Sequence, residues 1–278
     1  MLGSKIAMYM EYYKLREKPF NVTSDPNFLY MSKRHKEAFT HLIYGIKERK
    51  GFIEITGEVG TGKTTLCRAL LNKLDPNTKA AFIFNSDLSE LQLLQAIVED
   101  LGIRGGKRTK IDLFNKLNSF LIEQLRQGNN VVLILDEAQN LKPKVLEQMR
   151  MLSNLETEKE KLFQIILVGQ PELRDKLNSS NLRQLRQRIG IRYHILPLER
   201  DEVAGYINHR LYIAGSDGSV KFTDDAITKI YEYSTGIPRL INILSDKALL
   251  LGYVLETYEI TSGIIEKSIE EIEGRVMV

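Results

Sequence analysis

The sequence predicts an α/β fold in which helices cover a parallel sheet, followed by a small domain made of helices. Strands separated by amphipathic helices are typical of a parallel sheet that is covered on both faces. After Leu198 no further strand pattern appears, and only helical patterns remain. Before it, the chain alternates helical patterns with five short apolar runs: Phe52 to Thr56, Ala80 to Asn85, Val131 to Leu135, Phe163 to Gly169 and Ile191 to Leu196.

The change of pattern after Leu198 places a domain boundary near residues 197–201. A chain of 278 residues is near the upper size for one domain, so one large and one small domain are expected. We assign residues 1–45 to an N-terminal segment and helix leading into the core, residues 46–198 to the α/β core, and residues 199–278 to a helical lid domain.

Helical spacing of apolar residues predicts the helices themselves. Two such stripes are interpreted as core faces: Leu91, Leu94, Val98 and Leu101, and Leu113, Leu117, Phe120 and Leu121. Thr223, which precedes two aspartates, is a good N-cap for a helix of the lid domain. The lid helices are expected at Asp201 to Ala214, Asp224 to Ser234 and Pro238 to Leu255, with a fourth beginning at Thr261 or Ser262.

Composition gives no indication of a nucleic-acid-binding, disulfide-bonded, membrane-spanning or secreted protein. The net charge of +3 is close to neutral and does not by itself indicate nucleic-acid binding. The single cysteine, Cys67, allows no internal disulfide, favours a reducing compartment and is interpreted as a small buried side chain. No run reaches the about 18 to 20 apolar residues that span a bilayer, and Met1 to Met10 does not resemble a signal peptide. We expect a cytoplasmic protein, with any membrane association made through a partner or a region outside this chain.

The first predicted strand leads into a complete phosphate-loop pattern, G-x-x-x-x-G-K-[ST], before a helical run from Leu66 to Leu71. Glycines in such a loop let the backbone turn with positive φ, so that N–H groups approach phosphate oxygens. The lysine supplies positive charge to the β and γ phosphates, and the threonine hydroxyl ligates Mg²⁺. We therefore expect a nucleoside triphosphate to bind, with Thr64 on the metal, at Gly57, Glu58, Val59, Gly60, Thr61, Gly62, Lys63, Thr64 and Thr65.

The third predicted strand runs directly into two carboxylates, Asp136 and Glu137. A buried parallel strand that ends in acids delivers them to the carboxyl edge of the sheet, where the phosphate site is expected. Asp136 would hold Mg²⁺, directly or through water, and Glu137 would polarise the attacking water. A strand that runs into a solvated acidic turn is the alternative interpretation.

Five segments together resemble an AAA+ ATPase: GEVGTGKT from Gly57, LILDEAQ from Leu133, IILVGQPEL from Ile165, LRQLRQRI from Leu182 and GIPRLIN from Gly236. Within that class the chain resembles the ExeA or GspA type, which is associated with the type II general secretion pathway. Its relatives include regulators of transposition of the TnsC and TniB kind. The stretch KPFNVTSDPNFLYMSKRHKEAF also resembles the start of that family, so the similarity runs from about residue 9 to residue 272.

The resemblance implies roles for residues at matching positions. Gln170 occupies the place of sensor 1, which reads the γ phosphate and orients water, although most members have Asn, Thr or Ser there. Asn85 resembles a residue that holds the catalytic glutamate inactive until a ligand binds; a simple turn asparagine is the alternative. Arg188 occupies the place of an arginine finger, which enters the neighbouring subunit's site, with Arg183 and Arg186 as nearby competitors.

Arg239 matches sensor 2, which reaches from the lid domain to the γ phosphate. Gly236 would cap the preceding helix, and Pro238 would occupy the first turn of the next. The resemblance thus implies ATP and Mg²⁺ as cofactors and a site shared between subunits. The catalytic set that follows is Lys63, Asp136, Glu137, Gln170, Arg188 and Arg239.

A shared site implies ATP-dependent assembly into rings or filaments. Three functions stay open: an ATPase that acts with a partner protein in assembly of the secretion machinery, a DNA-associated regulator that recruits partner proteins, and a nucleotide-binding scaffold with little turnover. For the second, the basic residues Arg104, Lys107, Arg108 and Lys110 would track the backbone of duplex DNA. A solvated connector is the alternative for that loop.

Overall fold

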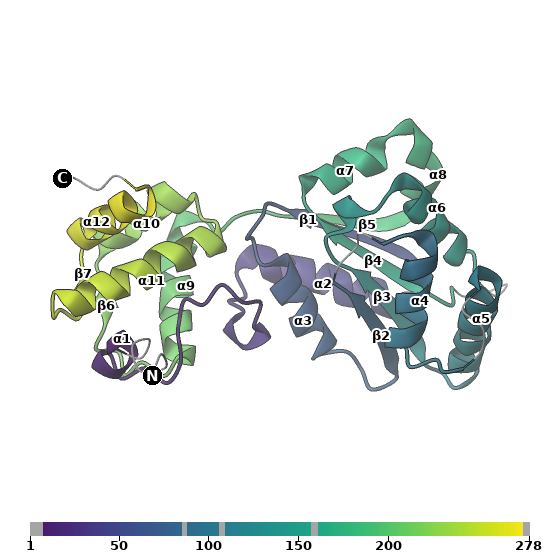
Figure 1. Ribbon diagram of the computed structural model, residues 1–278, viewed down its shortest axis with the longest axis horizontal. Coiled ribbons are helices and arrows are strands. Elements are labelled where there is room, and N and C mark those ends of the chain that lie inside the picture. Colours follow the sequence, from purple (N-terminus) through teal and green to yellow (C-terminus); the bar gives the residue numbers. More distant parts are fainter. Residues whose placement is uncertain (1–7, 85–87, 106–108, 157–160, 275–278) are drawn as a thin grey trace. The chain divides into compact units, whose positions relative to one another are not determined.

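The computed structural model of the protein describes residues 8–84, 88–105, 109–156 and 161–274 (Figure 1). The chain divides into two compact units, each with its own hydrophobic core. Of the described residues, the helical unit contains 8–35, the segment Gly60–Thr65 and 196–274. The sheet unit contains Lys36–Val59 and Leu66–Ile195.

Five parallel strands form the sheet unit's centre, in the order β2-β3-β4-β1-β5. They are β1 (Phe52–Gly57), β2 (Thr78–Ile83), β3 (Asn130–Leu135), β4 (Gln164–Gly169) and β5 (Ile189–Ile195). The predicted parallel α/β fold is confirmed, and the strand ends differ from the predicted ones by no more than two residues. Asn85, which was expected to end the second strand, lies outside the described residues.

Alternate residues of a strand face different layers of helices. Phe52 of β1 belongs to a core shared with α4 (Glu90–Asp100), α5 (Lys110–Arg126), α6 (Pro143–Leu152) and α7 (Pro171–Asn178). Its neighbour Ile53 packs against α2 (Lys33–Lys47), where a Cβ added to Gly45 would lie only 2.5 Å from Ile53 Cδ1. Gly45 therefore allows α2 to approach the sheet closely.

The predicted helix faces are partly confirmed. In α5, Leu113, Leu117 and Leu121 are buried, and Phe120 packs partly buried against the core. The prediction for Leu91 was wrong: it is 41% exposed because the buried face of α4 runs through Leu93, Leu94, Ile97 and Val98, and Leu91 lies to one side of that face. Cys67 is buried in α3 (Lys63–Leu71), as expected for a small apolar side chain.

The lid helices of the helical unit lie within one residue of their predicted bounds. They are α9 (Arg200–Ile213), α10 (Asp224–Ser234), α11 (Pro238–Val254) and α12 (Ser262–Ile272), and the short α1 (Met8–Tyr12) belongs to the same unit. Thr223 caps α10 by accepting the N–H of Ala226. The expectation of no strand after Leu198 was wrong, because β6 (Lys221–Phe222) and β7 (Glu259–Ile260) form a parallel pair. Strands of two residues are too short to produce a period-two pattern.

The N-terminal segment packs into the core of the helical unit. Tyr9 donates a hydrogen bond of 2.5 Å to Asp246 on α11. Arg210 of α9, only 6% exposed, donates to the backbone carbonyls of Pro19 and Asn21. Residues about 190 positions apart therefore satisfy each other's buried polar groups. Within the described ranges, no helix is long and apolar enough to cross a membrane.

Candidate functional site

Polar residues gather where the strands of the sheet end. β1 ends at Gly57, where the phosphate loop begins; Asp136 follows β3 directly, and Gln170 follows β4. Because these strands are parallel, their carboxyl ends lie at one edge of the sheet. Asp136 is fully buried, and its backbone N–H donates to Ile83 at the end of β2.

Glu137 has a left-handed backbone conformation, with φ 52° and ψ 37°. Its carboxylate oxygen Oε2 accepts the side-chain amide of Gln139 at 2.5 Å and that of Gln170 at 3.0 Å. Gln139 Oε1 in turn accepts the backbone N–H of Gln170 at 3.1 Å. The three residues form a closed cluster, which we call the Glu137 cluster, and it fixes one oxygen of the carboxylate.

Two further features hold Gln139 in this cluster. Lys176 of α7 donates to the backbone carbonyls of Gln139 and Leu141. A Cβ added to Gly169, the last residue of β4, would lie 2.7 Å from Gln139 Oε1. The glycine therefore leaves room for the amide. The sequence prediction missed Gln139, and its only signal was its place in the same short segment as the two acids.

The phosphate-loop segment Gly60–Thr65 belongs to the helical unit, where it contacts the start of α11. Gly60 has φ 84°, and its carbonyl accepts the backbone N–H of Arg239 at 3.2 Å. A Cβ at Gly60 would lie 2.6 Å from Arg239 Cβ, so both its φ and this close approach require glycine. Lys63, the first residue of α3, is 6% exposed.

The backbone around Arg239 follows the sequence prediction. α10 ends at Ser234, Gly236 has φ 78°, and Pro238 is the first residue of α11. A Cβ at Gly236 would lie 2.0 Å from the carbonyl oxygen of Leu198, whose own N–H donates to Gly236 at 2.9 Å. Arg239 thus enters α11 from a turn that only glycine can make.

The three candidate finger arginines lie in or just after α8 (Arg183–Arg186), in the sheet unit. Arg188 directly precedes β5, and its Nη1 donates to Ser153 Oγ at 3.1 Å. Burial, and then the nearby charge of Arg188, lower the pKa of Lys161. Arg186 donates to the carbonyl of Asn178 at 3.4 Å. Arg183 is exposed, and no described residue pairs with its side chain.

The structure describes the residues predicted to bind Mg²⁺ and two of the four residues predicted to bind DNA. In the described ranges, no group of three His, Cys, Asp or Glu side chains could hold a metal ion alone. Mg²⁺ with a nucleotide takes one or two protein oxygens and completes its shell with phosphates and water. The hydroxyl of Thr64 and the carboxylate of Asp136 are oxygen donors of this kind. In the basic loop, Arg104 is exposed and Lys110 pairs with Glu90, whereas Lys107 and Arg108 lie outside the described residues.

Comparison with known proteins identifies the family of this site. A family model described as an AAA domain matches residues 46–177. General secretion pathway protein A of Aeromonas hydrophila is 43% identical over 268 residues, covering 96% of this chain and 49% of that protein. The chain therefore spans about half the length of this curated relative.

Two solved structures share the fold at low sequence identity. The ORC2 protein of Aeropyrum pernix has a TM-score of 0.66 at 16% identity, covering 94% of this chain and 73% of that chain. The Drosophila ORC bound to DNA has a TM-score of 0.70 at 15% identity, covering 98% of this chain and 67% of that chain. The chain belongs to the AAA+ proteins and is of the general secretion pathway protein A type.

Proposed function

We propose that the chain binds ATP with Mg²⁺ and hydrolyses it to ADP and phosphate. The observation that carries the proposal is the Glu137 cluster, in which two amides hold one oxygen of a carboxylate at the carboxyl edge of a parallel sheet. The AAA domain match and the similarity to general secretion pathway protein A support a nucleotide as substrate.

Binding is assigned to the phosphate loop and its neighbours. Gly57 to Thr65 would hold the phosphates through backbone N–H groups, with Lys63 as the positive charge. Thr64 and Asp136 would be the protein ligands of Mg²⁺, which when bound neutralises charge that builds up on the phosphate oxygens.

Water activation is assigned to Glu137. Its Oε2 is occupied by the two amides, and within the described residues no donor reaches Oε1. That oxygen is therefore the one that would accept a hydrogen bond from the attacking water and orient it. Gln170 would act as sensor 1 through its contact with this carboxylate.

Two arginines are assigned to complete the site, one from the same subunit and one from its neighbour. Arg239 would act on the γ phosphate of its own subunit, because its backbone N–H already contacts the phosphate loop of the same chain. Arg188 would act as the finger that enters the neighbouring subunit's site and stabilises transition-state charge. A finger supplied from outside makes turnover depend on assembly into rings or filaments, and the isolated subunit would hydrolyse ATP only weakly.

The biological setting that we propose is assembly of secretion machinery, with a secretion protein as partner, because the 43% identical relative is a general secretion pathway protein. A DNA-associated regulator is the second candidate, since one solved structure with this fold is an ORC bound to DNA. The ion pair between Lys110 and Glu90 weakens that candidate, because it offsets one of the four charges assigned to DNA.

The proposal is tested by nucleotide binding, turnover and particle size measured on one preparation. Glu137→Gln is expected to keep ATP binding and to lower turnover by about a hundredfold or more, since it removes the group that polarises water. Lys63→Ala is expected to abolish both binding and turnover. Wild-type protein with Mg²⁺ and a non-hydrolysable ATP analogue is expected to form larger particles than the nucleotide-free protein.

The outcomes separate the candidate functions. Assembly that needs the ATP analogue and is unaffected by duplex DNA favours the secretion ATPase. Assembly on duplex DNA that weakens steeply with salt favours the regulator. Turnover by Glu137→Gln equal to that of the wild type contradicts the assignment of Glu137, and a wild-type protein that binds nucleotide without turnover is a scaffold.

A further inference from the structure

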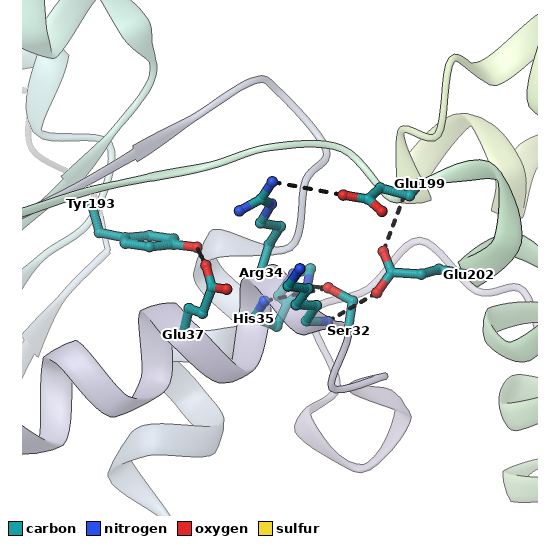
Figure 2. A network of polar contacts seen from close by, with 8 residues as sticks. Ser32, Arg34, His35, Glu37, Tyr193, Glu199 and Glu202 are labelled. Atoms are coloured by element: carbon teal, nitrogen blue, oxygen red, sulfur yellow. Dashed lines mark hydrogen bonds and ion pairs between the residues drawn. The ribbon is translucent and has the colours of Figure 1, made fainter.

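His35 is a buried histidine that the roles assigned above leave unused. It lies in the first turn of α2, three residues after Ser32, and is 3% exposed (Figure 2). Its ring nitrogen Nε2 lies 2.9 Å from the carbonyl oxygen of Thr61, in the middle of the phosphate loop. Nδ1 lies 2.7 Å from Ser32 Oγ, which also accepts the backbone N–H of His35 at 3.3 Å.

These contacts define which ring nitrogen carries the proton. A carbonyl oxygen can only accept, so the Nε2 of His35 must be the donor to Thr61. Nδ1 is then an acceptor, and the hydroxyl of Ser32 donates to it. Burial lowers the pKa of His35, which favours the neutral ring that this arrangement needs. Both nitrogens of the imidazole are thereby satisfied.

The start of α2 is itself fixed by charged groups at the N-terminal end of α9, as Figure 2 shows. Glu202 accepts the backbone N–H of Lys33 at 2.9 Å through Oε1 and that of Glu199 at 3.1 Å through Oε2. One carboxylate therefore caps the N-termini of two helices. Arg34 adds an ion pair with Glu199 at 3.6 Å. The imidazole of His35 is thus presented to the loop from a well-fixed helix end.

The hydrogen bond from His35 to the Thr61 carbonyl also orients the N–H of Gly62, which belongs to the same peptide group. In a planar trans peptide the C=O and the N–H point in opposite directions. Holding the Thr61 carbonyl toward His35 therefore aims the N–H of Gly62 away from the ring. Gly62 has φ 91°, a conformation that glycine enters freely, so this peptide could flip at little cost without a restraint. A flipped peptide would present an oxygen in place of the N–H.

We propose that His35 is a positioning residue that locks the Thr61–Gly62 peptide in the orientation with which the phosphate loop binds phosphate. The inference rests on the proposed nucleotide-binding function and deepens it. Thr61 is fully buried, so in this arrangement solvent does not compete with the imidazole for its carbonyl oxygen. Gly62 is part of the same contact, since a Cβ there would lie 3.1 Å from His35 Nε2.

Two substitutions at His35 distinguish the effect of losing the hydrogen-bond donor at the Nε2 position from the effect of losing the imidazole ring. Gln places an amide nitrogen as many bonds from Cβ as Nε2 is, whereas the shorter Asn matches only Nδ1. His35→Asn is expected to weaken binding of a fluorescent ADP analogue with Mg²⁺ about tenfold, because it leaves the Thr61 carbonyl without its donor. His35→Gln is expected to bind within about threefold of the wild type. His41→Asn, on the exposed side of the same helix, is the matched control.

Results that overturn the proposal differ from those that overturn the nucleotide site. Equal affinity of wild type and His35→Asn contradicts the lock, and so does equal loss in His35→Asn and His35→Gln. If His35→Asn does not fold, Ser32→Ala keeps the ring and is expected to weaken binding by about two- to fivefold, with wild-type affinity counting against the proposal. Nitrogen NMR of the wild-type ring is expected to show a protonated Nε2, and a protonated Nδ1 would disprove the lock. A wild type that binds no nucleotide contradicts the proposed function instead.

Discussion

Glu137 has a backbone conformation that non-glycine residues seldom adopt. Its φ of 52° lies in the left-handed region, where such strain is typical of functional sites. The turn that it makes brings Gln139 back toward the carboxylate, and Gln170 arrives from the end of β4. The sequence predicted Asp136 and Glu137 because they directly follow an apolar run. It could not predict Gln139, whose contact depends on the conformation of Glu137 and on a residue 31 positions later.

We expect Gln139→Leu to lower the turnover of bound ATP by about tenfold to a hundredfold, since hydrogen bonds to charged groups are worth about 1.5–3 kcal/mol. Affinity for nucleotide should stay unchanged, because Gln139 acts on Glu137 and has no assigned contact with phosphate. Single-turnover hydrolysis and equilibrium binding measure the two quantities. Gln184→Leu, at an exposed glutamine of α8, is the control and should change neither. A rise in turnover would mean that the cluster restrains Glu137 and does not position it.

At the scale of elements, the five strands of the main sheet were predictable from short runs rich in apolar residues between helical patterns, and only their ends shifted. β1 has a charged residue in its middle. Glu54 lies in its middle at 3% exposure and faces Arg192 of β5, with 3.4 Å between carboxylate and guanidinium. Burial raises the pKa of Glu54, and the charges of Arg192 and Arg174 oppose that rise only in part. This single charged residue did not prevent the prediction of β1. The identity of its ion-pair partner could not be predicted, because it depends on the register between β1 and β5.

Glu54→Gln is expected to stabilise the sheet unit by about 1 kcal/mol at neutral pH. The raised pKa means that the folded state binds the proton more tightly than the unfolded state. The wild type therefore has its full stability below the ordinary pKa of 4.5 and loses stability as pH rises through the higher folded value. The substitution removes that loss, so the difference in free energy of unfolding between variant and wild type should shrink toward pH 4.5. Urea unfolding at several pH values measures this difference, with Glu48→Gln, at an exposed glutamate, as the control. A variant less stable than the wild type at neutral pH would show that the ion pair stabilises more than burial of the charge destabilises.

At the scale of the whole molecule, the sequence pattern indicated a change of architecture near Leu198, and the family resemblance implied that Arg239 acts at the phosphate loop. Neither indicated that the N-terminal segment packs with the C-terminal helices. Residues 8–35 and the segment Gly60–Thr65 cluster with the C-terminal helices. These groupings depend on contacts between residues far apart in the sequence, such as Arg210 with Pro19 and Arg239 with Gly60, and on a hydrophobic core that the N-terminal segment shares with the C-terminal helices. Periodicity reports a helix's buried face and not the identity of what covers it, so contacts of this kind are beyond sequence patterns.

The assignment of each arginine to its own or a neighbouring subunit predicts the result of mixing inactive variants. In a head-to-tail assembly, a Glu137→Gln subunit still supplies Arg188 to its neighbour, and an Arg188→Ala subunit still supplies Glu137. An equal mixture should therefore recover about a quarter of wild-type turnover, the fraction of interfaces that combine the two intact halves. Mixing Glu137→Gln with Arg239→Ala should recover none, because Arg239 serves the loop of its own chain, as its contact with Gly60 indicates. Recovery in both mixtures would place Arg239 in the neighbour's site. Recovery in neither would transfer the role of arginine finger from Arg188 to the exposed Arg183. A mixture of Glu137→Gln with Arg183→Ala would test that role.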